Sequence, residues 1–131
     1  EIKVLACSFT SAPITRALLA ARKRGVAVTV VADEKSNLSE GGGNQKAVAA
    51  LSALSNAGAD VRTTSAWAIH HDKVILIDKT HVETGSFNFS ASAETRNSEN
   101  VLVNWNNPDL VAIYLAHFER NFKQSRPFIA R

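Results

Sequence analysis

Short runs of apolar and β-branched residues recur along the chain, and polar or glycine-containing stretches separate them. Runs of this length and composition predict β-strands. The run at 26–33 is nearly all apolar, which is the pattern of a strand in a sheet covered on both faces. The predicted strands are residues 2–9, 26–33, 59–64, 68–78, 81–87 and 98–105, with a tight turn at Asp78–Thr80.

Apolar residues at helical spacing predict helices between these strands. In residues 11–25 one face is apolar, Ser11 can cap the first turn and Gly25 can end the helix. Residues 45–58 form a second predicted helix. The last helix starts at Asn107-Pro108-Asp109 and carries an apolar stripe of Val111, Tyr114, Leu115, Phe118 and Phe122.

The order of these elements predicts the architecture. Strands alternate with helices at first and then follow one another directly, which indicates an α/β fold: a mixed, mostly buried β-sheet flanked by helices on both faces. A chain of 131 residues is expected to form a single domain, 1–131. Residues 34–44 are interpreted as a loop. Its glycines, Gly41–Gly43, make it a candidate substrate-contact loop, but it lacks the phosphate-loop pattern.

The composition narrows the class of protein. Cys7 is the single cysteine, which excludes an intrachain disulfide and a cysteine-rich zinc site. The apolar strand around Cys7 favours a packed thiol over a catalytic one. No apolar run approaches the ~20 residues that cross a bilayer, and no signal-peptide pattern is present. Because the chain begins directly in a strand, we expect a mature or trimmed form.

The charge balance bears on the substrate. The formal net charge is +3 and the isoelectric point is about 9.3. This mildly basic balance is compatible with a polyanionic substrate. Many proteins of this charge bind no nucleic acid, so the balance alone identifies no function.

The segment AIHHDKVILID (68–78) places two histidines, an aspartate and a lysine around an apolar run. Side chains of a strand alternate between its two faces. His71 is therefore expected on the same face as Lys73, and His70 on the other face with Asp72. Two positions apart on a strand, His71 and Lys73 have Cα atoms roughly 6–7 Å apart, so both heads can reach one phosphate-sized anion.

The segment GSFN supplies further polar groups shortly afterwards. Ser86 and Asn88 bracket an aromatic residue, and they follow a strand that is predicted to pair with the strand of Lys73. Both side chains are small hydrogen-bond donors. Gly85, at the start of the segment, allows close approach of another backbone.

Two carboxylates complete the set. Asp78 lies five residues beyond Lys73, which favours a structural role in the turn over a catalytic one. Glu99, in RNSEN, begins another predicted strand. Its carboxylate can hold the imidazole of His71 in one tautomer and favour the protonated form.

The set H-x-K-x4-D, G-S-x-N and a later glutamate resembles the phospholipase D superfamily. HHDKVILID, ETGSFNFS and RNSEN are similar to the small bacterial endonucleases of that superfamily, which carry one such motif per chain. The similarity runs over most of the chain, including SFTSAPI (8–14) and the final helix. Phospholipases and lipid synthases of the superfamily usually carry two copies in one chain, whereas this chain has one.

The resemblance implies a metal-independent phosphodiesterase without a cofactor, foremost a nonspecific endonuclease acting on DNA, with RNA as the second substrate. It implies that His71 is the nucleophile and forms a covalent phosphohistidine. The His71 of a second chain would protonate the leaving alcohol. Lys73, with Ser86 and Asn88, would stabilise the phosphate oxygens. Glu99 would orient the imidazole.

The implied partners follow from these roles. The expected assembly is a homodimer with a shared active site, since one motif supplies one histidine. The expected substrate is nucleic acid, and no stable membrane association is expected. The resemblance also implies a periplasmic or secreted location. The competing hypotheses are a lipid phosphodiesterase and a catalytically silent nucleic-acid-binding module of the same fold.

Metal binding at the paired histidines is disfavoured. His70, His71 and Asp72 carry the side chains of metal ligands. They are expected to alternate between the two faces of a strand, so they do not converge on one point. Lys73 would also repel a cation.

Other polar and aromatic side chains have ordinary structural interpretations. The basic cluster Arg22–Arg24 suits a solvated helix end, with phosphate contact as the alternative. Trp67 and Trp105 can stack on bases, but core or interface packing is preferred. His81 and His117 are interpreted as surface or helix-face residues.

Overall fold

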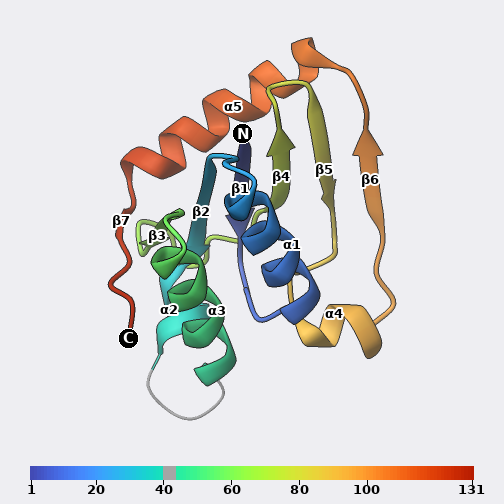
Figure 1. The fold of residues 1–131 in the computed structure, drawn as a ribbon. Helices are drawn as coiled ribbons and strands as arrows, with labels where there is room; N and C mark the ends of the chain where they lie inside the picture. The colour runs from blue at the N-terminus through green and yellow to red at the C-terminus, as the bar shows by residue number, and fades with distance from the viewer. Residues whose placement is uncertain (40–43) are drawn as a thin grey trace.

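The computed structural model describes residues 1–39 and 44–131 (Figure 1). This part of the chain forms one seven-stranded sheet in the order β6-β5-β4-β1-β2-β3-β7. The β1–β2 and β2–β3 pairs are parallel, and all other neighbouring pairs are antiparallel. The strands are β1 (Ile2–Ala6), β2 (Val28–Asp33), β3 (Asp60–Thr64), β4 (Lys73–Ile77), β5 (His81–Gly85), β6 (Val101–Asn104) and β7 (Arg126–Pro127).

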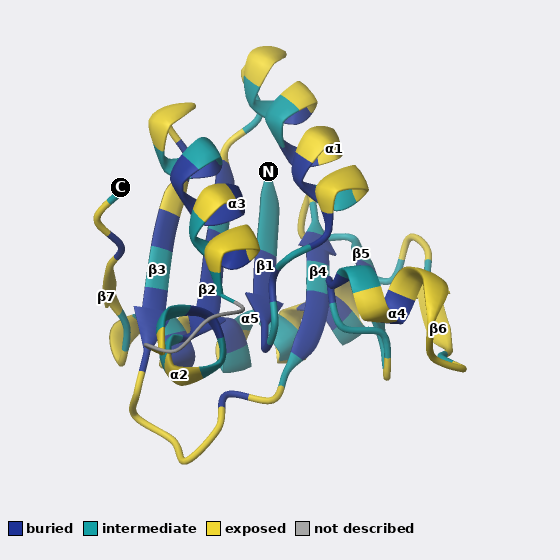
Figure 2. Ribbon diagram, turned by 90° about the horizontal axis from the view of Figure 1, so that it is seen from below, coloured by how far each residue is buried: buried dark blue, intermediate teal, exposed yellow. Residues whose placement is uncertain are grey.

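Helices cover both faces of this sheet. In Figure 2, α1 and α3 lie above the strands and α5 lies below them. The predicted α/β fold, with a mixed sheet between helices, is therefore confirmed. None of the described helices combines the length and the apolar character needed to cross a membrane. The helices are α1 (Ala12–Lys23), α2 (Glu34–Leu38), α3 (Gln45–Asn56), α4 (Ala91–Thr95) and α5 (Pro108–Lys123).

Strand alternation divides the core into two layers. Val4 and Ala6 of β1 are fully buried on the side of α1 and α3. Leu5, between them, is fully buried on the side of α5 with Phe118. Because both faces of β1 are covered, Val4, Leu5 and Ala6 are all apolar, and Lys3 near its start is the one charged residue of the strand. Cys7 follows β1 and is also buried, as expected for a packed thiol.

The predicted strand 68–78 is too long at its start. β4 begins at Lys73, which pairs with Ala6, the last residue of β1. Earlier residues have no β1 partner and leave the sheet. The main-chain N–H of His70 donates instead to the buried carboxylate of Asp33 at 2.8 Å. A side-chain acceptor at the end of β2 thus replaces the ladder hydrogen bond that a strand would have made.

Short helices account for other differences from the predicted pattern. The predicted loop 34–44 contains α2, because Asp33 caps this helix by accepting from the N–H of Ser36. α4 follows Ser90, whose hydroxyl caps its first turn. Neither helix was predicted, since both are too short for a helical period to show. The glycines Gly41–Gly43 lie outside the described residues.

Candidate active site

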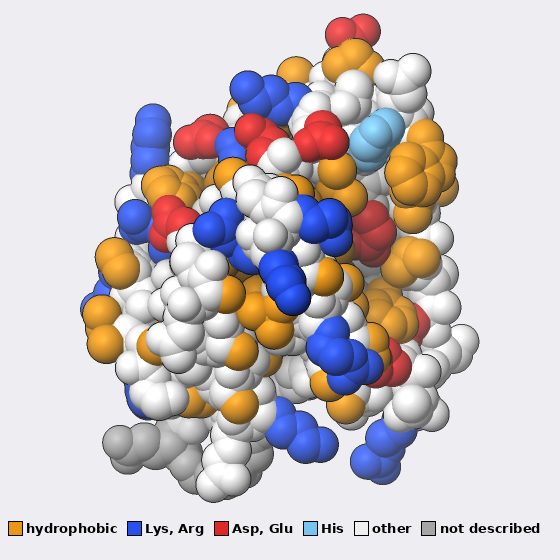
Figure 3. Space-filling model, in the orientation of Figure 1, with side chains coloured by type: hydrophobic (Ala, Val, Ile, Leu, Met, Phe, Trp, Pro, Cys, Tyr) orange, Lys and Arg blue, Asp and Glu red, His pale blue; other side chains and the backbone are white. Residues whose placement is uncertain are grey.

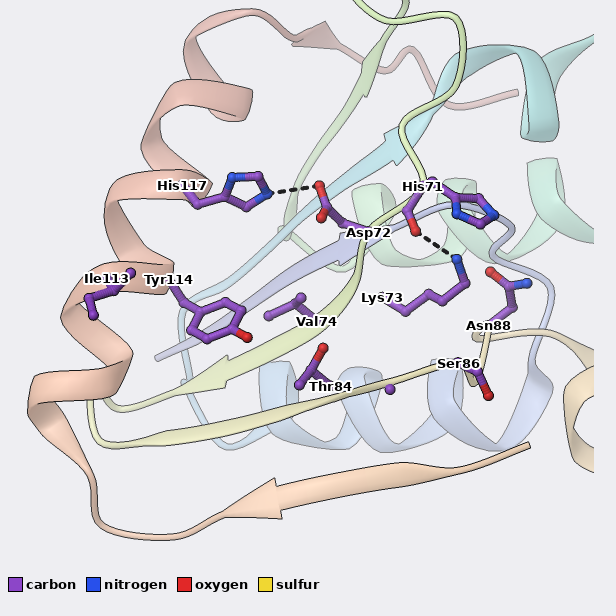
Figure 4. Close-up of a pocket in the computed structure, with 11 residues that line it drawn as sticks. His71, Asp72, Lys73, Val74, Thr84, Ser86, Asn88, Ile113, Tyr114 and His117 are labelled. Carbon is purple, nitrogen blue, oxygen red and sulfur yellow. Dashed lines mark hydrogen bonds and ion pairs between the residues drawn. The ribbon is translucent and has the colours of Figure 1, made fainter.

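A cavity of about 710 Å³ lies where β4 begins and β5 ends, beneath α5 (Figure 4). We call His71, Lys73, Ser86 and Asn88 the motif side of this cavity. We call the residues on α5 that line it, Ile113, Tyr114 and His117, the helix side. Asp72, Val74, Thr84 and Gly85 complete the lining. The four-residue motif side is thus assembled from two segments that were predicted to converge.

The histidine and lysine of the H-x-K pattern both line the cavity. Lys73 is the first residue of β4 and is 9% exposed. Its ammonium donates to the main-chain carbonyl of His71 at 2.6 Å. That hydrogen bond fixes the cation next to the imidazole of His71. Figure 4 shows both side chains at the same end of the cavity, beside Asn88.

The neighbouring histidines have opposite environments, as the sequence predicted. His70 is 2% exposed and lies outside the cavity lining, whereas His71 is exposed and lines it. The predicted reason is only partly right, because both residues precede β4 and strand alternation does not itself orient them. The hydrogen bond from the N–H of His70 to Asp33 is found where the two histidines take different environments.

Asn88 carries an unsatisfied polar group inside the site. Its Oδ1 atom is buried and has no hydrogen-bond partner in the described part of the chain. Buried polar atoms are nearly always paired, and an exception in a cavity marks a place where another group binds. The amide of Asn88 is therefore available to a substrate or to a neighbouring imidazole.

Ser86 and Glu99 interact with each other. The hydroxyl of Ser86 donates to the Glu99 carboxylate at 2.6 Å and accepts from the N–H of Asn100 at 3.1 Å. Asn97 also donates to Glu99, at 3.0 Å. These hydrogen bonds, led by that of Ser86, lower the pKa of Glu99.

The predicted contact between Glu99 and His71 is absent within one chain. No hydrogen bond or ion pair joins the two residues in the described ranges, and Glu99 does not line the cavity. Its carboxylate faces the loop of Ser86 instead. In this structure Glu99 therefore supports the G-S-x-N segment rather than the imidazole.

Gly85 and Asp78 have the structural roles that their positions suggested. A Cβ atom on Gly85 would lie 2.3 Å from the carbonyl oxygen of Asn100, so only glycine allows this approach of the two backbones. Asp78 lies in the turn from β4 to β5, at the opposite end of β4 from Lys73. Asp78 and Lys79 both have positive φ values, as the two central residues of a type I′ turn require, and the N–H of Thr80 donates to the carbonyl of Ile77 at 3.0 Å.

His117 and Asp72 are site residues that the sequence analysis missed. His117 Nε2 lies 3.0 Å from Asp72 Oδ2, and both side chains line the cavity. His70 Nε2 lies 3.1 Å from the same oxygen. The contact with His70, with a smaller contribution from His117, outweighs burial and lowers the pKa of Asp72 to about 2.

A signal for His117 was present in the helical pattern. It lies between Tyr114 and Phe118 of the predicted apolar stripe, so α5 must turn it toward the sheet. Trp67 is 46% exposed and Trp105 is 69% exposed, so neither packs in the core of one chain, and the alternative of interface packing stays a prediction. Arg22 donates to the carbonyls of Val26 and Ala57, so this member of the basic cluster has a structural role.

The arrangement suits chemistry on a phosphate group. The motif side presents an imidazole, an ammonium and an amide at one end of the cavity (Figure 4). An imidazole can act as nucleophile or proton carrier, and a fixed ammonium can stabilise negative charge on oxygen. No group of three or more His, Cys, Asp or Glu side chains is arranged for metal binding in residues 1–39 and 44–131.

Comparison with known sequences gives a family match over most of the chain. Residues 1–122 match the family model described as "Cardiolipin synthase, PLD-like domain". A phospholipase D of Rickettsia conorii is 42% identical over 103 residues, which are 79% of this chain and 48% of that protein. A mitochondrial cardiolipin hydrolase of Danio rerio is 33% identical over 121 residues, which are 92% of this chain and 50% of that protein. The chain thus spans about half the length of these curated relatives.

Comparison with solved structures agrees with the sequence match. The structure of Nuc from Salmonella typhimurium, described as a phospholipase D family member, superposes with a TM-score of 0.92. The two chains are 44% identical, and the match covers 98% of this chain and 82% of Nuc. The resemblance stated from the motifs is therefore confirmed at the level of family and fold.

Proposed function

The chain belongs to the family of phospholipase D-like domains, and we propose that it is a metal-independent phosphodiesterase, specifically a nonspecific endonuclease that cleaves DNA. RNA is the second substrate to test. The observation that carries this proposal is the motif side of the cavity, where Lys73 is bonded to the main chain of His71 beside the amide of Asn88. An imidazole held next to a fixed cation is suited to attack on a phosphodiester.

The proposed reaction has two steps. A ring nitrogen of His71 attacks the phosphorus, the N–P bond forms, and the bond from phosphorus to the leaving oxygen breaks. The leaving oxygen takes a proton from His71 of a second copy. Water then attacks the phosphorus and gives its proton to that second histidine. The N–P bond breaks, and both imidazoles return to their starting states.

Charge stabilisation in both steps is assigned to Lys73 and Asn88. The non-bridging oxygens gain negative charge as the phosphorus becomes five-coordinate, and a preorganised ammonium stabilises that charge. The hydrogen bond from Lys73 to the carbonyl of His71 leaves its other N–H groups available. Ser86 contributes indirectly, because its hydroxyl is bonded to Glu99. This cation supplies the charge that a bound metal supplies elsewhere.

A second copy is needed because one chain supplies one motif histidine. Support for a dimer comes from apolar side chains exposed around the cavity. Ile113 of the helix side is 69% exposed, and Leu102 on the edge strand β6 is 62% exposed. Figure 3 shows apolar side chains along the edge where Figure 1 places β6. Exposed apolar surface on an unpaired edge strand commonly marks an interface.

Nucleic acid is favoured as the substrate by the surface charge. The chain is basic, with a net charge of +3. Lys and Arg side chains are spread over the face formed by α1 and α3 in Figure 3. A basic surface attracts a polyanion through its phosphates without reading the sequence. This supports a nonspecific nuclease.

A lipid phosphodiesterase is the second candidate. The names of the relatives favour it, since they are a phospholipase D and a cardiolipin hydrolase. Val74, Ile113 and Tyr114 also give the cavity an apolar wall that could contact an acyl chain. The chemistry on phosphorus would be the same. Only the group bonded to the phosphate would differ.

One experiment separates these candidates. Purified protein is incubated in excess EDTA with supercoiled plasmid, with single-stranded RNA, and with vesicles containing cardiolipin or phosphatidylcholine. We expect nicked plasmid and no hydrolysed lipid, and no nicking by His71→Ala. Lipid hydrolysis without nicking would favour the second candidate. Strict dependence on a divalent cation would contradict the role of Lys73.

A further inference from the structure

Asp72 occupies an unusual place in the motif, because it lies between the proposed nucleophile and the lysine. Its carboxylate lines the cavity, and one of its oxygens lies close to the ring nitrogens of two histidines. His117 Nε2, from α5, lies 3.0 Å from Asp72 Oδ2. His70 Nε2 lies 3.1 Å from the same oxygen, although its angle is outside that of a hydrogen bond. Asp72 thus links the segment of His71 to α5.

His117 uses both of its ring nitrogens for contacts within the protein. Nε2 faces Asp72 at 3.0 Å, and Nδ1 lies 3.3 Å from the guanidinium of Arg120. Arg120 can only donate and the Asp72 carboxylate can only accept, so these two contacts favour the tautomer with Nδ1 as acceptor and the proton on Nε2, whereas the side-chain nitrogen of Asn121, 3.4 Å from Nε2, is the more distant contact. The side chain of Asn121 also donates to the carbonyl of His117 at 3.0 Å. Neither ring nitrogen is therefore free to exchange a proton with a substrate.

The direction of the two rings supports the same distinction. In Figure 4 the ring of His117 points toward Asp72, whereas the ring of His71 lies at the other end of the cavity with Lys73 and Asn88. A histidine that protonates a leaving group must reach that oxygen directly or through one water. His117 instead reaches the carboxylate next to the proposed nucleophile.

The contact between Asp72 and His117 matters because the segment that contains His71 leaves the sheet. Residues before Lys73 have no β1 partner to fix their backbone. Asp33 fixes one side of the segment through the N–H of His70 at 2.8 Å. Asp72 fixes the other side through His117. Displacement of a reacting group by about 1 Å can reduce a rate about 100-fold.

We propose that His117 is a positioning residue, which acts through Asp72 to fix His71 and Lys73, and that it is not the second proton-transfer histidine. The proposal rests on the phosphodiesterase function proposed above. It assigns the in-chain histidine of the cavity a supporting role. The proton carrier must then come from the second copy.

The test compares His117→Gln with His117→Ala. Glutamine can donate a hydrogen bond to Asp72 but cannot carry a proton at neutral pH, whereas alanine can do neither. We expect His117→Ala to lose about 10- to 100-fold in kcat, with KM nearly unchanged. We expect His117→Gln to retain kcat within a few-fold of the wild type, with the same pH profile. Lys123→Gln, an exposed change on α5, serves as the control for helix substitutions.

Two outcomes would overturn the proposal. If His117→Gln is as inactive as His71→Ala and loses one limb of the pH profile, His117 carries a proton. If His117→Ala has the wild-type kcat, His117 does not position His71 or Lys73. Both readings require that the variants keep the wild-type melting temperature within a few degrees, and a variant that fails this is replaced by His117→Asn.

A second measurement does not depend on activity. The unfolding free energies of Asp72→Asn, His117→Ala and the double variant form a thermodynamic cycle. We expect the double variant to be less destabilised than the sum of the single variants. Nitrogen-15 NMR of His117 should show the proton on Nε2. If the two substitutions have additive effects on the unfolding free energy and the proton lies on Nδ1, the His117–Asp72 pair is refuted even if the wild type cleaves DNA. If the two residues are coupled but the wild type is inactive, the proposed function alone is refuted.

Discussion

The two sides of the cavity differ in how completely their polar groups are satisfied. On the helix side, His117 has a partner for each ring nitrogen. On the motif side, Asn88 Oδ1 is buried without a hydrogen-bond partner among the described residues, and the hydrogen bond of Lys73 Nζ is to the main chain of His71. Both sides of the cavity contain a histidine, and the contrast is between the fully partnered ring of His117 and the unpaired amide oxygen of Asn88 among the described residues.

This difference separates reacting groups from supporting ones. A polar group with spare hydrogen-bonding capacity in a cavity is available to a ligand, whereas a saturated group maintains geometry. Residue type alone would have ranked His71 and His117 equally. We therefore propose, from their partners, that His71 takes part in chemistry and that His117 has a supporting role. The predictions below test this division, beginning with the largest expected effect.

The largest effect is expected at the exposed member of the histidine pair. His71→Ala should reduce plasmid nicking at least about 10³-fold, because one substitution removes both the nucleophile and the proton carrier of a dimer. His70→Gln should remain within about tenfold of wild type, since His70 contacts Asp33 and Asp72 and does not itself line the cavity. Initial rates with EDTA present measure both. Equal inactivity of two folded, dimeric variants would show that both histidines take part in the chemistry.

The dimer can be tested with the same variant. His71→Ala and wild-type chains are mixed, and heterodimers are isolated through two different affinity tags. Each shared site then lacks either its nucleophile or its proton carrier, so we expect little activity in the heterodimer. Sedimentation showing only monomer at active concentrations would contradict the shared site.

The next largest effect is expected at Gly85, which directly precedes Ser86 of the motif side. Gly85→Ala would place a Cβ atom 2.3 Å from the carbonyl oxygen of Asn100, so β5 and β6 must separate. We expect a loss of about 2–4 kcal/mol in unfolding free energy, with reduced nicking. Gly25→Ala is the matched control, because its φ is also positive but its Cβ would meet no atom within 4 Å. Its cost should be about 1 kcal/mol. Equal losses in urea denaturation would show that the contact with Asn100 is unimportant.

Much of the fold could be predicted from the sequence because strand and helix periods are local. The nearly all-apolar run of β2 predicted burial on both faces, and the stripe on α5 predicted which side packs on the sheet. The start of β4 could not be predicted, because it depends on where β1 ends at Ala6. The short helices α2 and α4 depend on the caps Asp33 and Ser90, which give weak signals alone.

The candidate site was predictable where its residues belong to one sequence motif. His71, Lys73 and Asn88 meet because the spacing of the pattern matches the β4–β5 hairpin. His117 is 46 residues from His71 by their numbers in the chain, and only the packing of α5 brings it to Asp72. Within one chain Glu99 accepts a hydrogen bond from Ser86 rather than contacting His71, because the segments that follow β5 and precede β6 lie side by side, so its role toward His71 stays a prediction.

A smaller effect is expected from the anchor of the His70 main chain. The Asp33 carboxylate is 2% exposed and accepts from His70 N–H, Ser36 N–H and the Ser36 hydroxyl. Asp33→Asn leaves at least one of these donors unpaired, which should cost about 1–3 kcal/mol. Ser36→Ala removes one of the three bonds and should cost less. Urea denaturation and nicking rates measure both, and an unchanged kcat in a stable Asp33→Asn variant would show that the anchor does not position His71.

The smallest effect is a pH dependence of stability with opposite signs at two carboxylates. Contact with His70 and then His117 lowers the pKa of Asp72 from 3.8 to about 2, so its contribution is present above pH 3.8 and is lost as the pH falls toward 2. Glu83, between Ile75 and Val103 in the sheet, is raised by burial from 4.5 to about 7. Because the folded state then binds the proton more tightly, stability falls as the pH rises from 4.5 to 7.

The variants Glu83→Gln and Asp72→Asn separate the two carboxylates. Glu83→Gln should flatten the curve of melting temperature against pH between 4.5 and 7. At pH 8 it should exceed the wild type by about 1 kcal/mol, a value reduced for solvent screening. Asp72→Asn should flatten the acid limb instead and leave the neutral limb unchanged. A wild-type curve that is level from pH 4.5 to 7 would show that the Glu83 carboxylate, on the face of β5 opposite the cavity-lining Thr84, stays hydrated.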